Sequence, residues 1–428
     1  MRYVGLDVHK HTVHACILDS AGKKVFTGDI ACTRQGLRHF AARRLQQDDK
    51  VVLEATTNTW AVVGELKPFV ASVTTSNPLR TKAIAEAKVK TDKVDAEVLA
   101  QLLRCDYLPS VWEPDGTTCR LRKLTGLRAS LVNERTRIKN RMRSVLAQLL
   151  IEPPVSWLFG DDGLEWLKGV ELPEDERVMI QCQLQWLDLV QKQLENLDLQ
   201  LQRLAYEQDK VRLLMTLPGV SHTIALSLLA ALGDVSRFRD GDHAASYLGL
   251  TPSTRQSAAH CYHGPITKAG NSHARCMLVQ GAQHLATHPG PLGVFFRRLA
   301  KKKNRNVAVI ASARKLVTIA DLMLKNNEPY RYATPYATDR KLSCIRFRAT
   351  GVRRKPATNP AKGKTAAAGK GGQPARDARA TRSLPEIYQG EGLPPLKTIE
   401  QLPAGEQRVL KAAGVERFVR QVHAAPAR

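Results

Sequence analysis

The order of apolar and polar positions divides the chain into regions with different periods. In residues 1–112, short apolar runs predict strands at 3–7, 13–18, 24–30, 50–54 and 69–74, and longer periodic runs predict helices at 34–45, 60–66 and 91–103. The first three strands follow one another directly, whereas the later strands alternate with helices. This order predicts a mixed α/β sheet with helices packed beside it.

That order resembles a ribonuclease-H-like fold, and we place a first domain at 1–112. Residues 117–150 predict a long helix with apolar side chains at roughly heptad spacing, and 174–215 predict a second. The two helices can pair as an antiparallel hairpin or dimerise between chains, so 113–212 is predicted as a coiled-coil segment. Residues 213–330 predict a second domain that is mainly helical, with a polar loop that runs through Gly270.

One turn within the second domain has two interpretations. The sequence Leu217-Pro218-Gly219-Val220-Ser221 resembles a helix-hairpin-helix element, in which a tight turn offers backbone amides to a phosphate. The alternative is an ordinary helix corner inside a core. The basic surroundings favour the DNA-backbone interpretation, with Gly219 as a nucleic-acid contact.

Residues 331–428 are predicted as a basic low-complexity tail with a small helical appendage. From Ile345 to Ser383 the chain has eleven basic residues and only Asp377 as an acid. A segment rich in Ala, Gly, Pro, Lys and Arg lacks the apolar side chains for a core, so we expect a disordered tail that binds nucleic acid. Residues 384–428 predict the appendage.

Charge points to a nucleic-acid partner for the whole chain. It has 65 Lys and Arg against 40 Asp and Glu, a net charge of +25. The first long helix has nine basic residues between Arg120 and Arg143 and only Glu134 as an acid. These side chains form either a solvated face or a phosphate-binding face. For the second case we predict contacts from Arg128, Arg135, Lys139 and Arg143.

The cysteines and the apolar runs indicate where in the cell the protein is located. The eight cysteines include no Cys-x-x-Cys pair, which favours reduced thiols over a disulfide framework. No apolar run approaches the length of a membrane span, and the N-terminus lacks a signal-peptide pattern. We therefore expect no membrane partner and a cytoplasmic, nucleoid-associated location.

Four carboxylates in the first domain are candidates for one metal site. Asp7 and Glu54 each end an apolar run, and Asp92 and Asp95 are three residues apart on one helix face. Mg²⁺ prefers oxygen ligands, and a pair of such ions supports phosphodiester chemistry. Each carboxylate alone is more typical of a turn, a strand end or a helix cap, but the four together favour a metal site.

These motifs, together with a second set near residue 250, resemble the DEDD transposases of the insertion-sequence one-ten family. The resemblance rests on Gly-Leu-Asp-Val, Leu-Glu-Ala-Thr and Lys-Thr-Asp-Lys-Val-Asp-Ala in the first domain, and on Leu-Pro-Gly-Val and Gly-Leu-Thr-Pro in the second. It covers residues 1 to about 330. The family includes relatives of the Piv DNA invertase and of bridge-RNA-guided recombinases. It implies a RuvC-like domain, a coiled-coil segment and a serine-bearing transposase domain.

Several functional expectations follow from that resemblance. The family's metal-binding tetrad falls on Asp7, Glu54, Asp92 and Asp95, and its nucleophilic serine falls on Ser257. The resemblance implies Mg²⁺, with Mn²⁺ as an alternative, and a 5′-phosphoserine link to DNA. It also implies donor and target DNA, a non-coding guide RNA, and a homo-oligomer, either dimer or tetramer, in a bacterial cell.

The segment around the serine departs from the family pattern and contains further polar residues. Ala258-Ala259 stand where the family usually has two glycines, and Ser253 is an alternative nucleophile. We expect Arg255, Lys268, Asn271 and Arg275 to contact phosphate or to position the substrate. The segment also has cysteines and histidines that could bind zinc, although their spacing matches no standard finger: His260, Cys261, His263, His273 and Cys276.

Three other functions are compatible with these residues. A site-specific DNA invertase of the same architecture would use the same side chains. A RuvC-like nuclease would attack with water and leave Ser257 idle. A catalytically silent nucleic-acid-binding protein is disfavoured, because all five candidate catalytic residues are intact.

Overall fold

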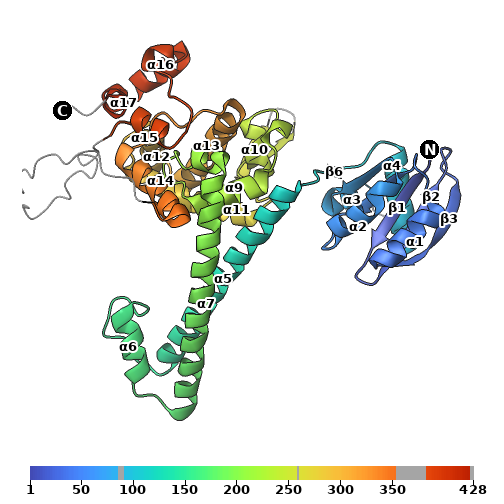
Figure 1. Cartoon of the computed structure of the whole chain (residues 1–428), viewed down its shortest axis with the longest axis horizontal. Helices are drawn as coiled ribbons and strands as arrows, with labels where there is room; N and C mark the ends of the chain where they lie inside the picture. Colours follow the sequence, from blue (N-terminus) through green and yellow to red (C-terminus); the bar gives the residue numbers. More distant parts are fainter. Residues whose placement is uncertain (85–90, 258–259, 353–381, 425–428) are drawn as a thin grey trace, which may run out of the picture. The chain divides into compact units, whose positions relative to one another are not determined.

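The computed structural model describes residues 1–84, 91–257, 260–352 and 382–424. It divides into two compact units, Met1–Pro114 (unit 1) and Asp115–Arg428 (unit 2). Figure 1 labels the elements of both. Each unit has a hydrophobic core of its own.

Unit 1 is built on a mixed sheet. Its elements are β1 (Tyr3–Val8), β2 (Thr12–Leu18), β3 (Lys24–Ala31), α1 (Arg34–Arg44), β4 (Lys50–Glu54), α2 (Thr59–Leu66), the 3-10 turn η1 (Lys67–Phe69), β5 (Ser72–Ser76), α3 (Pro78–Ile84), α4 (Asp92–Arg104) and β6 (Ser110–Val111). The described strands form a six-stranded sheet in the order β3-β2-β1-β4-β5-β6. Strands β1, β4 and β5 are parallel, and the other pairings are antiparallel. This mixed sheet agrees with the expected ribonuclease-H-like class.

Helices cover both faces of this sheet. Leu6 and Leu53 point to the face that packs against α1 and α2, where Phe40 and Leu66 complete the core. On the opposite face, Ala96 and Ala100 of α4 join buried residues of β2. One predicted strand is displaced, since β5 begins at Ser72 rather than at residue 69. The cause is the turn η1, where Pro68 fixes the backbone and donates no hydrogen bond.

Unit 2 is mainly helical. Its elements are α5 (Gly116–Gln148), α6 (Asp161–Gly169), α7 (Glu174–Glu207), α8 (Asp209–Leu214), α9 (His222–Leu232), η2 (Val235–Arg237), α10 (Gly241–Tyr247), β7 (Pro252–Ser257), β8 (His260–Ile266), α11 (Ser272–Gln283), η3 (His284–Thr287), α12 (Pro291–Lys302), α13 (Arg305–Asn326), α14 (Pro335–Thr350), α15 (Leu384–Gly390), η5 (Ile399–Gln401), α16 (Ala404–Ala412) and α17 (Glu416–His423). In the described part of the chain, no helix combines the length and apolar character needed to cross a membrane.

The long helices α5 and α7 lie side by side within the chain (Figure 1). Arg128 pairs with Asp198, whereas Arg141, further along α5, donates to Gln183, which is earlier on α7. As the residue numbers of the contacts increase along α5, those of their partners on α7 decrease, so the two helices are antiparallel. Of the two pairings that the sequence left open, the structure contains the antiparallel hairpin. The second helix is shorter than predicted, because extended backbone at Gln208 separates α7 from α8.

Two other predictions for unit 2 require correction. The polar segment before Gly270 was expected as a loop, but it forms the antiparallel hairpin of β7 and β8. The predicted tail also starts too early, because α14 continues to Thr350 and buries Ile345. Tyr388 of α15 is fully buried in the same core as α9 and α13. Residues 353–381, which hold most of the predicted tail, lie outside the described residues.

Candidate active site and nucleic-acid surfaces

Asp7 of β1 and Glu54 of β4 occupy matching positions on neighbouring parallel strands. Leu6 is the ladder partner of Leu53, so the next residue on each strand is a carboxylate. Side chains alternate between the faces of a sheet, which places Asp7 on the same face as Gly5. Glu54 shares that face because it follows the same register. The two carboxylates at the strand ends therefore lie on the face covered by α4.

Gly5 lets α4 come close to the sheet. A Cβ atom at Gly5 would lie 1.9 Å from the carbonyl oxygen of Ala96 and 2.8 Å from the backbone nitrogen of Ala100. No side chain fits in that space, so only glycine permits this packing. The close approach fixes how far the first turn of α4 is from the carboxylates of the strands.

The first turn of α4 supplies the other two predicted carboxylates. The Thr91 side chain caps the helix by accepting a hydrogen bond from the backbone N–H of Val94. Asp92 and Asp95 follow in the first turn, where the helix dipole favours negative charge. Asp92 is exposed and Asp95 is half-buried.

The carboxylates of this region interact electrostatically. Asp7 has a side chain only 19% exposed, and its burial raises its pKa above the ordinary value. The neighbouring charges of Asp92 and Asp95 also raise the pKa of Asp7, whereas His9 lowers it. A half-buried carboxylate beside two others is stabilised by a cation, and the oxygen donors suit a hard divalent metal. The residues present therefore fit the metal that the DEDD motif implies.

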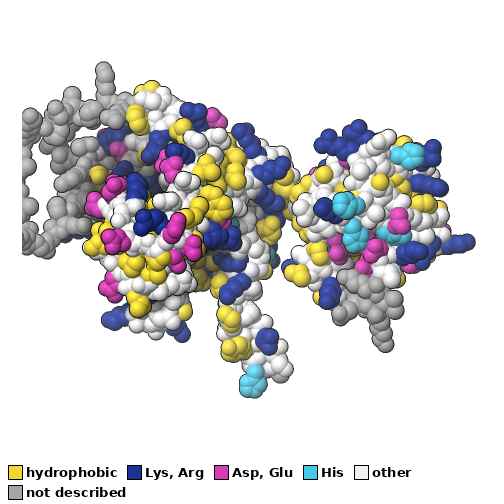
Figure 2. All heavy atoms as spheres, turned by 90° about the horizontal axis from the view of Figure 1, so that it is seen from below, with side chains coloured by type: hydrophobic (Ala, Val, Ile, Leu, Met, Phe, Trp, Pro, Cys, Tyr) yellow, Lys and Arg dark blue, Asp and Glu magenta, His cyan; other side chains and the backbone are white. Residues whose placement is uncertain are grey.

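His9 also belongs to this region, although the sequence analysis did not select it. Its Nε2 atom lies 3.2 Å from Oδ2 of Asp7 and 3.4 Å from Oδ2 of Asp92. Among the described residues, these three form the single group of potential ligands that lie within 4.8 Å of one another. The signal in the sequence was a histidine two positions after a strand-end aspartate. Figure 2 shows acidic and histidine side chains gathered on one face of unit 1.

Ser257 is the last residue of β7. Its cross-strand partner is His260, the first residue of β8. Ala258-Ala259, the departure from the family pattern, lie outside the described residues. Most of the hairpin is exposed, and Ser257 itself is exposed. We call β7 and β8 the serine hairpin.

The base of the serine hairpin is held by backbone contacts. Gly249 has a φ of +69°, and a Cβ there would lie 2.3 Å from the carbonyl oxygen of Ala269. Arg275 of α11 donates to the carbonyl oxygens of Leu248 and Ala269 at 3.0 and 2.9 Å. The N–H of Thr267 also donates to the carbonyl oxygen of Thr251, the residue before β7, at 2.9 Å. These bonds fix the base of the hairpin, although its strands have no core of their own.

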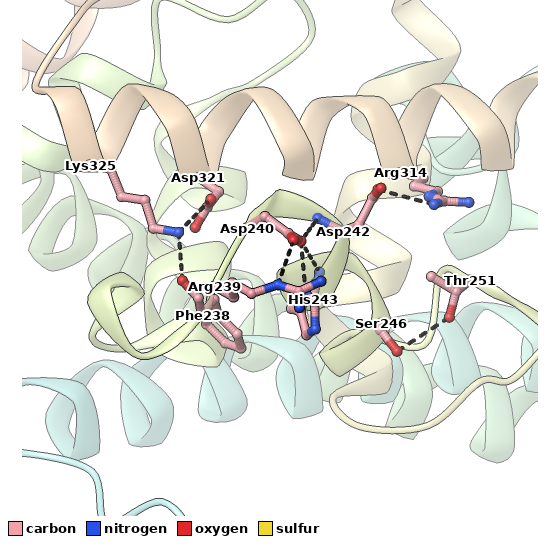
Figure 3. A network of polar contacts seen from close by, with 10 residues as sticks. All are labelled: Phe238, Arg239, Asp240, Asp242, His243, Ser246, Thr251, Arg314, Asp321 and Lys325. Carbon is pink, nitrogen blue, oxygen red and sulfur yellow. Dashed lines mark hydrogen bonds and ion pairs between the residues drawn. The ribbon is translucent and has the colours of Figure 1, made fainter.

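Helix α10, which leads into the hairpin, is anchored to α13 (Figure 3). The side chain of Asp240 caps α10 by accepting from the backbone N–H groups of Asp242 and His243. Hydrogen bonds from the side chain and backbone of His243 hold the pKa of Asp240 well below its ordinary value. Arg314 of α13 donates to Asp242 at 3.0 Å. At the other end, Thr251 donates to Ser246 at 3.5 Å. The segment that precedes β7 is therefore tied to a long buried helix.

The four residues predicted to contact phosphate near the serine differ in their surroundings. Arg255 and Lys268 are exposed, and Lys268 has a left-handed backbone with a φ of +55°. Asn271 instead caps α11 by accepting from the N–H of Ala274. Arg275 is occupied with two carbonyl groups. The structure thus gives Asn271 and Arg275 internal roles, and the phosphate role stays a prediction for all four.

The candidate zinc ligands do not gather into one group in the described part of the chain. Cys261 and His263 lie 3.8 Å apart on β8, and His263 also contacts Thr254. His273 instead contacts Ser227 of α9 at 3.2 Å. Cys276 is exposed on α11. This arrangement gives the zinc alternative no support.

The basic residues selected on α5 mostly face the protein. Arg128 forms an ion pair with Asp198 at 2.5 Å, and Arg135 donates to Gln191 at 3.2 Å. Lys139 lies over the rings of Trp157 and Phe159, where burial lowers its pKa, as do nearby Arg135 and Arg143. Arg143 is exposed, although it also contacts Phe159. Three others of the nine basic residues of α5 are exposed and form what we call the exposed basic stripe: Arg120, Lys123 and Arg137. Arg141 is exposed as well, but it donates to Gln183 of α7.

The Leu-Pro-Gly-Val turn is packed within unit 2. Gly219 has a φ of +74°, and a Cβ there would lie 2.1 Å from the carbonyl oxygen of Gly281. The buried Nζ of Lys341 donates to the carbonyl oxygens of Leu217 and Val220 at 2.8 and 3.1 Å, and burial lowers its pKa to about 7. These contacts support the alternative of a packed corner. A phosphate contact at Gly219 stays a prediction.

Two protein-family models match this chain. A model described as DEDD transposase of the IS110 type matches residues 4–151, and a model of the transposase IS116/IS110/IS902 family matches residues 211–293. The first match contains the four carboxylates, and the second contains Ser257.

Several curated relatives match most of their own length. The pilin gene-inverting protein of Moraxella bovis is 26% identical over 350 residues, which cover 77% of this chain and 97% of that protein. The uncharacterized 43.6 kDa protein of insertion element IS110 from Streptomyces coelicolor is 26% identical, covering 78% and 96%. The transposase for insertion sequence element IS1111A of Coxiella burnetii is 23% identical, covering 77% and 92%. The chain belongs to the IS110 family of transposases.

Proposed function

We propose that this transposase cleaves and exchanges DNA strands with a carboxylate-bound divalent metal and a serine nucleophile. The metal ligands are Asp7, Glu54, Asp92 and Asp95 (the acidic site), and the nucleophile is Ser257. The observation that carries the proposal is the acidic site itself. Two carboxylates share one face of the sheet, and the helix packed on that face begins with the other two.

The acidic site would hold Mg²⁺, which neutralises charge on a phosphate and lowers the barrier to its substitution. The half-buried Asp7 stands beside the exposed Asp92, so the site has both a fixed side and a side open to solvent. The first turn of α4 sets the spacing of Asp92 and Asp95. These residues would bind the ion, and the ion would hold the scissile phosphate.

Ser257 carries out the covalent step. A bond forms between its Oγ atom and the phosphorus, while the bond between phosphorus and the 3′-oxygen breaks. The serine proton passes to a base or to water, and the leaving 3′-oxygen takes up a proton. The resulting 5′-phosphoserine conserves the energy of the phosphodiester, so a second 3′-hydroxyl can restore the strand.

The proposal includes the partners that the family resemblance implies. These are donor and target DNA, a non-coding guide RNA that selects them, and a homo-oligomer that holds two strands. The second candidate is a site-specific DNA invertase, which the name of the Moraxella bovis relative favours. The exposed basic stripe of α5 and the exposed Arg255 are the surfaces that we assign to nucleic-acid backbone.

A covalent-adduct assay tests the proposal. Purified protein is incubated with RNA from the flanking region, donor DNA and Mg²⁺, and the trapped complex is digested and mapped by mass spectrometry. We expect a DNA adduct on Ser257 in the wild type, no adduct in Ser257→Ala, and a normal adduct in Ser253→Ala. Ser253 is a suitable control because its Oγ is already bonded, donating to the carbonyl oxygen of Pro265. Cleavage at the normal rate by Ser257→Ala would instead indicate water attack.

A further inference from the structure

His9 has the position of a metal ligand, not of a free surface histidine. Its Nε2 atom lies between the carboxylates of β1 and α4, at 3.2 Å from Asp7 and 3.4 Å from Asp92. The three ligand atoms fit within 4.8 Å of one another. His9 lies outside the four-carboxylate motif, so the site offers one donor more than that motif contains.

The backbone holds His9 in this position. Its N–H donates to the carbonyl oxygen of Thr12 at 2.9 Å, which closes the turn between β1 and β2. Its carbonyl oxygen accepts from Asn58 at 3.5 Å, and Asn58 precedes α2 on the segment that follows Glu54. The turn that carries the histidine is therefore closed onto the start of β2 and contacts the segment that follows β4.

The chemistry of an added nitrogen donor favours a different ion from an all-oxygen site. Mg²⁺ prefers oxygen ligands in a near-ideal octahedron and loses its waters reluctantly. First-row transition ions accept imidazole together with carboxylates. We propose that His9 is a nitrogen ligand of the acidic site and shifts its preference from Mg²⁺ toward Mn²⁺. This inference rests on the proposed function, because it uses the same carboxylates.

The matched control lies in the same turn. His11 is also exposed, two residues further along, and its carbonyl oxygen accepts from the N–H of Cys32. His11 is absent from the ligand group. Comparing His9→Gln with His11→Gln therefore separates a ligand from a nearby histidine without changing the charge of either carboxylate.

Electron paramagnetic resonance of full-length protein loaded with Mn²⁺ tests the inference without an activity assay. In pulsed spectra, we expect coupling to an imidazole ¹⁴N nucleus in the wild type and in His11→Gln, and none in His9→Gln. Titrations of free Mn²⁺ and competition with Mg²⁺ should show that His9→Gln lowers the preference for Mn²⁺ by roughly tenfold or more. His11→Gln should leave that preference unchanged.

The outcomes distinguish this inference from the proposed function. Mn²⁺ bound without ¹⁴N coupling, or coupling that persists in His9→Gln, overturns the role of His9 and leaves the acidic site standing. Mn²⁺ affinity that Asp92→Asn fails to weaken overturns the acidic site, and the role of His9 with it.

Discussion

The acidic site and the serine hairpin are supported in opposite ways. The strands β1 and β4 are buried on both faces of the sheet, and Val4, Leu6, Val51 and Leu53 are fully buried. The strands β7 and β8 are mostly exposed, and only their base is fixed by α10 and α11. Metal ligands require fixed spacing, which a core provides. A serine at the end of an exposed hairpin is accessible to a large substrate such as DNA.

The largest expected effect lies on the acidic side of this comparison. Glu54→Gln should reduce metal-dependent strand cleavage more than about 100-fold, because even the outer partners of metal ligands contribute 10–100-fold. The control is Glu97→Gln on α4, which removes a surface ion pair with Lys24. Cleavage rates in a gel assay check the result. Normal cleavage by Glu54→Gln would show that Glu54 is not a metal ligand.

A pH effect should appear in the core of unit 2, outside both sites of this comparison. His288 is buried, and burial lowers its pKa from 6.5 to about 4, with Lys341 and Arg297 also lowering it. The unfolded state then binds more protons between these values, so the stabilisation is complete above about pH 6.5 and is lost as pH falls toward 4. The loss attributable to His288 is roughly 2–3 kcal/mol from pH 7 to about pH 4.5.

The variant His288→Asn isolates that contribution. The Nδ1 atom of His288 accepts from the N–H of Gly290 at 3.1 Å, and an asparagine oxygen can replace this acceptor without titrating. Urea unfolding of unit 2 at pH 7 and at about pH 4.5 measures the free energy of unfolding. That free energy should depend less on pH in the variant than in the wild type. An equal dependence in both proteins would assign the effect to other groups, such as the buried His222.

One added methyl group should disturb the packing of α4 on the sheet beside the acidic site. In Gly5→Ala the new Cβ would overlap the carbonyl oxygen of Ala96, so α4 must move, and we expect a loss of about 1–3 kcal/mol of unfolding free energy together with weaker metal binding. Gly64→Ala on α2 is the control, since no atom lies within 4 Å of its new Cβ. Thermal unfolding with and without Mn²⁺ measures both effects. Equal stability of the two variants would contradict this account of α4.

The smallest expected effect lies on the serine hairpin. Tyr262 of β8 is 67% exposed, so Tyr262→Ala should change the free energy of unfolding by no more than about 0.5 kcal/mol. Denaturant unfolding of the full chain measures it. A loss comparable with that of Gly5→Ala would mean that the hairpin has a packing partner, and the contrast between the two regions would fail.

Features that depend on local sequence were predicted, and those that depend on distant contacts were not. Apolar runs placed β1, β2, β4 and α4 within a residue or two, because burial of such runs needs no knowledge of the partner. Spacing alone places His9 near Asp7, but its approach to Asp92 depends on how the turn after β1 packs beside α4. Tyr388 fills a core site because its hydroxyl donates to the carbonyl oxygen of Tyr330, far away in sequence.

The candidate nucleic-acid contacts show the same limit. Counting charges correctly identified α5 as a basic helix, but it could not separate the side chains that face α7 from those that face solvent. Lys139 was selected for its charge, and it lies against aromatic rings of the segment between the two helices. The hairpin of β7 and β8 was missed for a related reason. Its exposed strands lack the alternation of apolar side chains that predicts a strand.

The exposure of the serine hairpin has an evolutionary consequence. Residues such as Arg255, Gln256 and Tyr262 support no core, so their replacement meets little selection for folding. Gly249 and Arg275, at the base, are constrained by backbone contacts. The surface around Ser257, the proposed nucleophile, can therefore change while the base of the hairpin keeps its contacts. Such a division lets substitutions in one short stretch of sequence change this surface at little cost to folding.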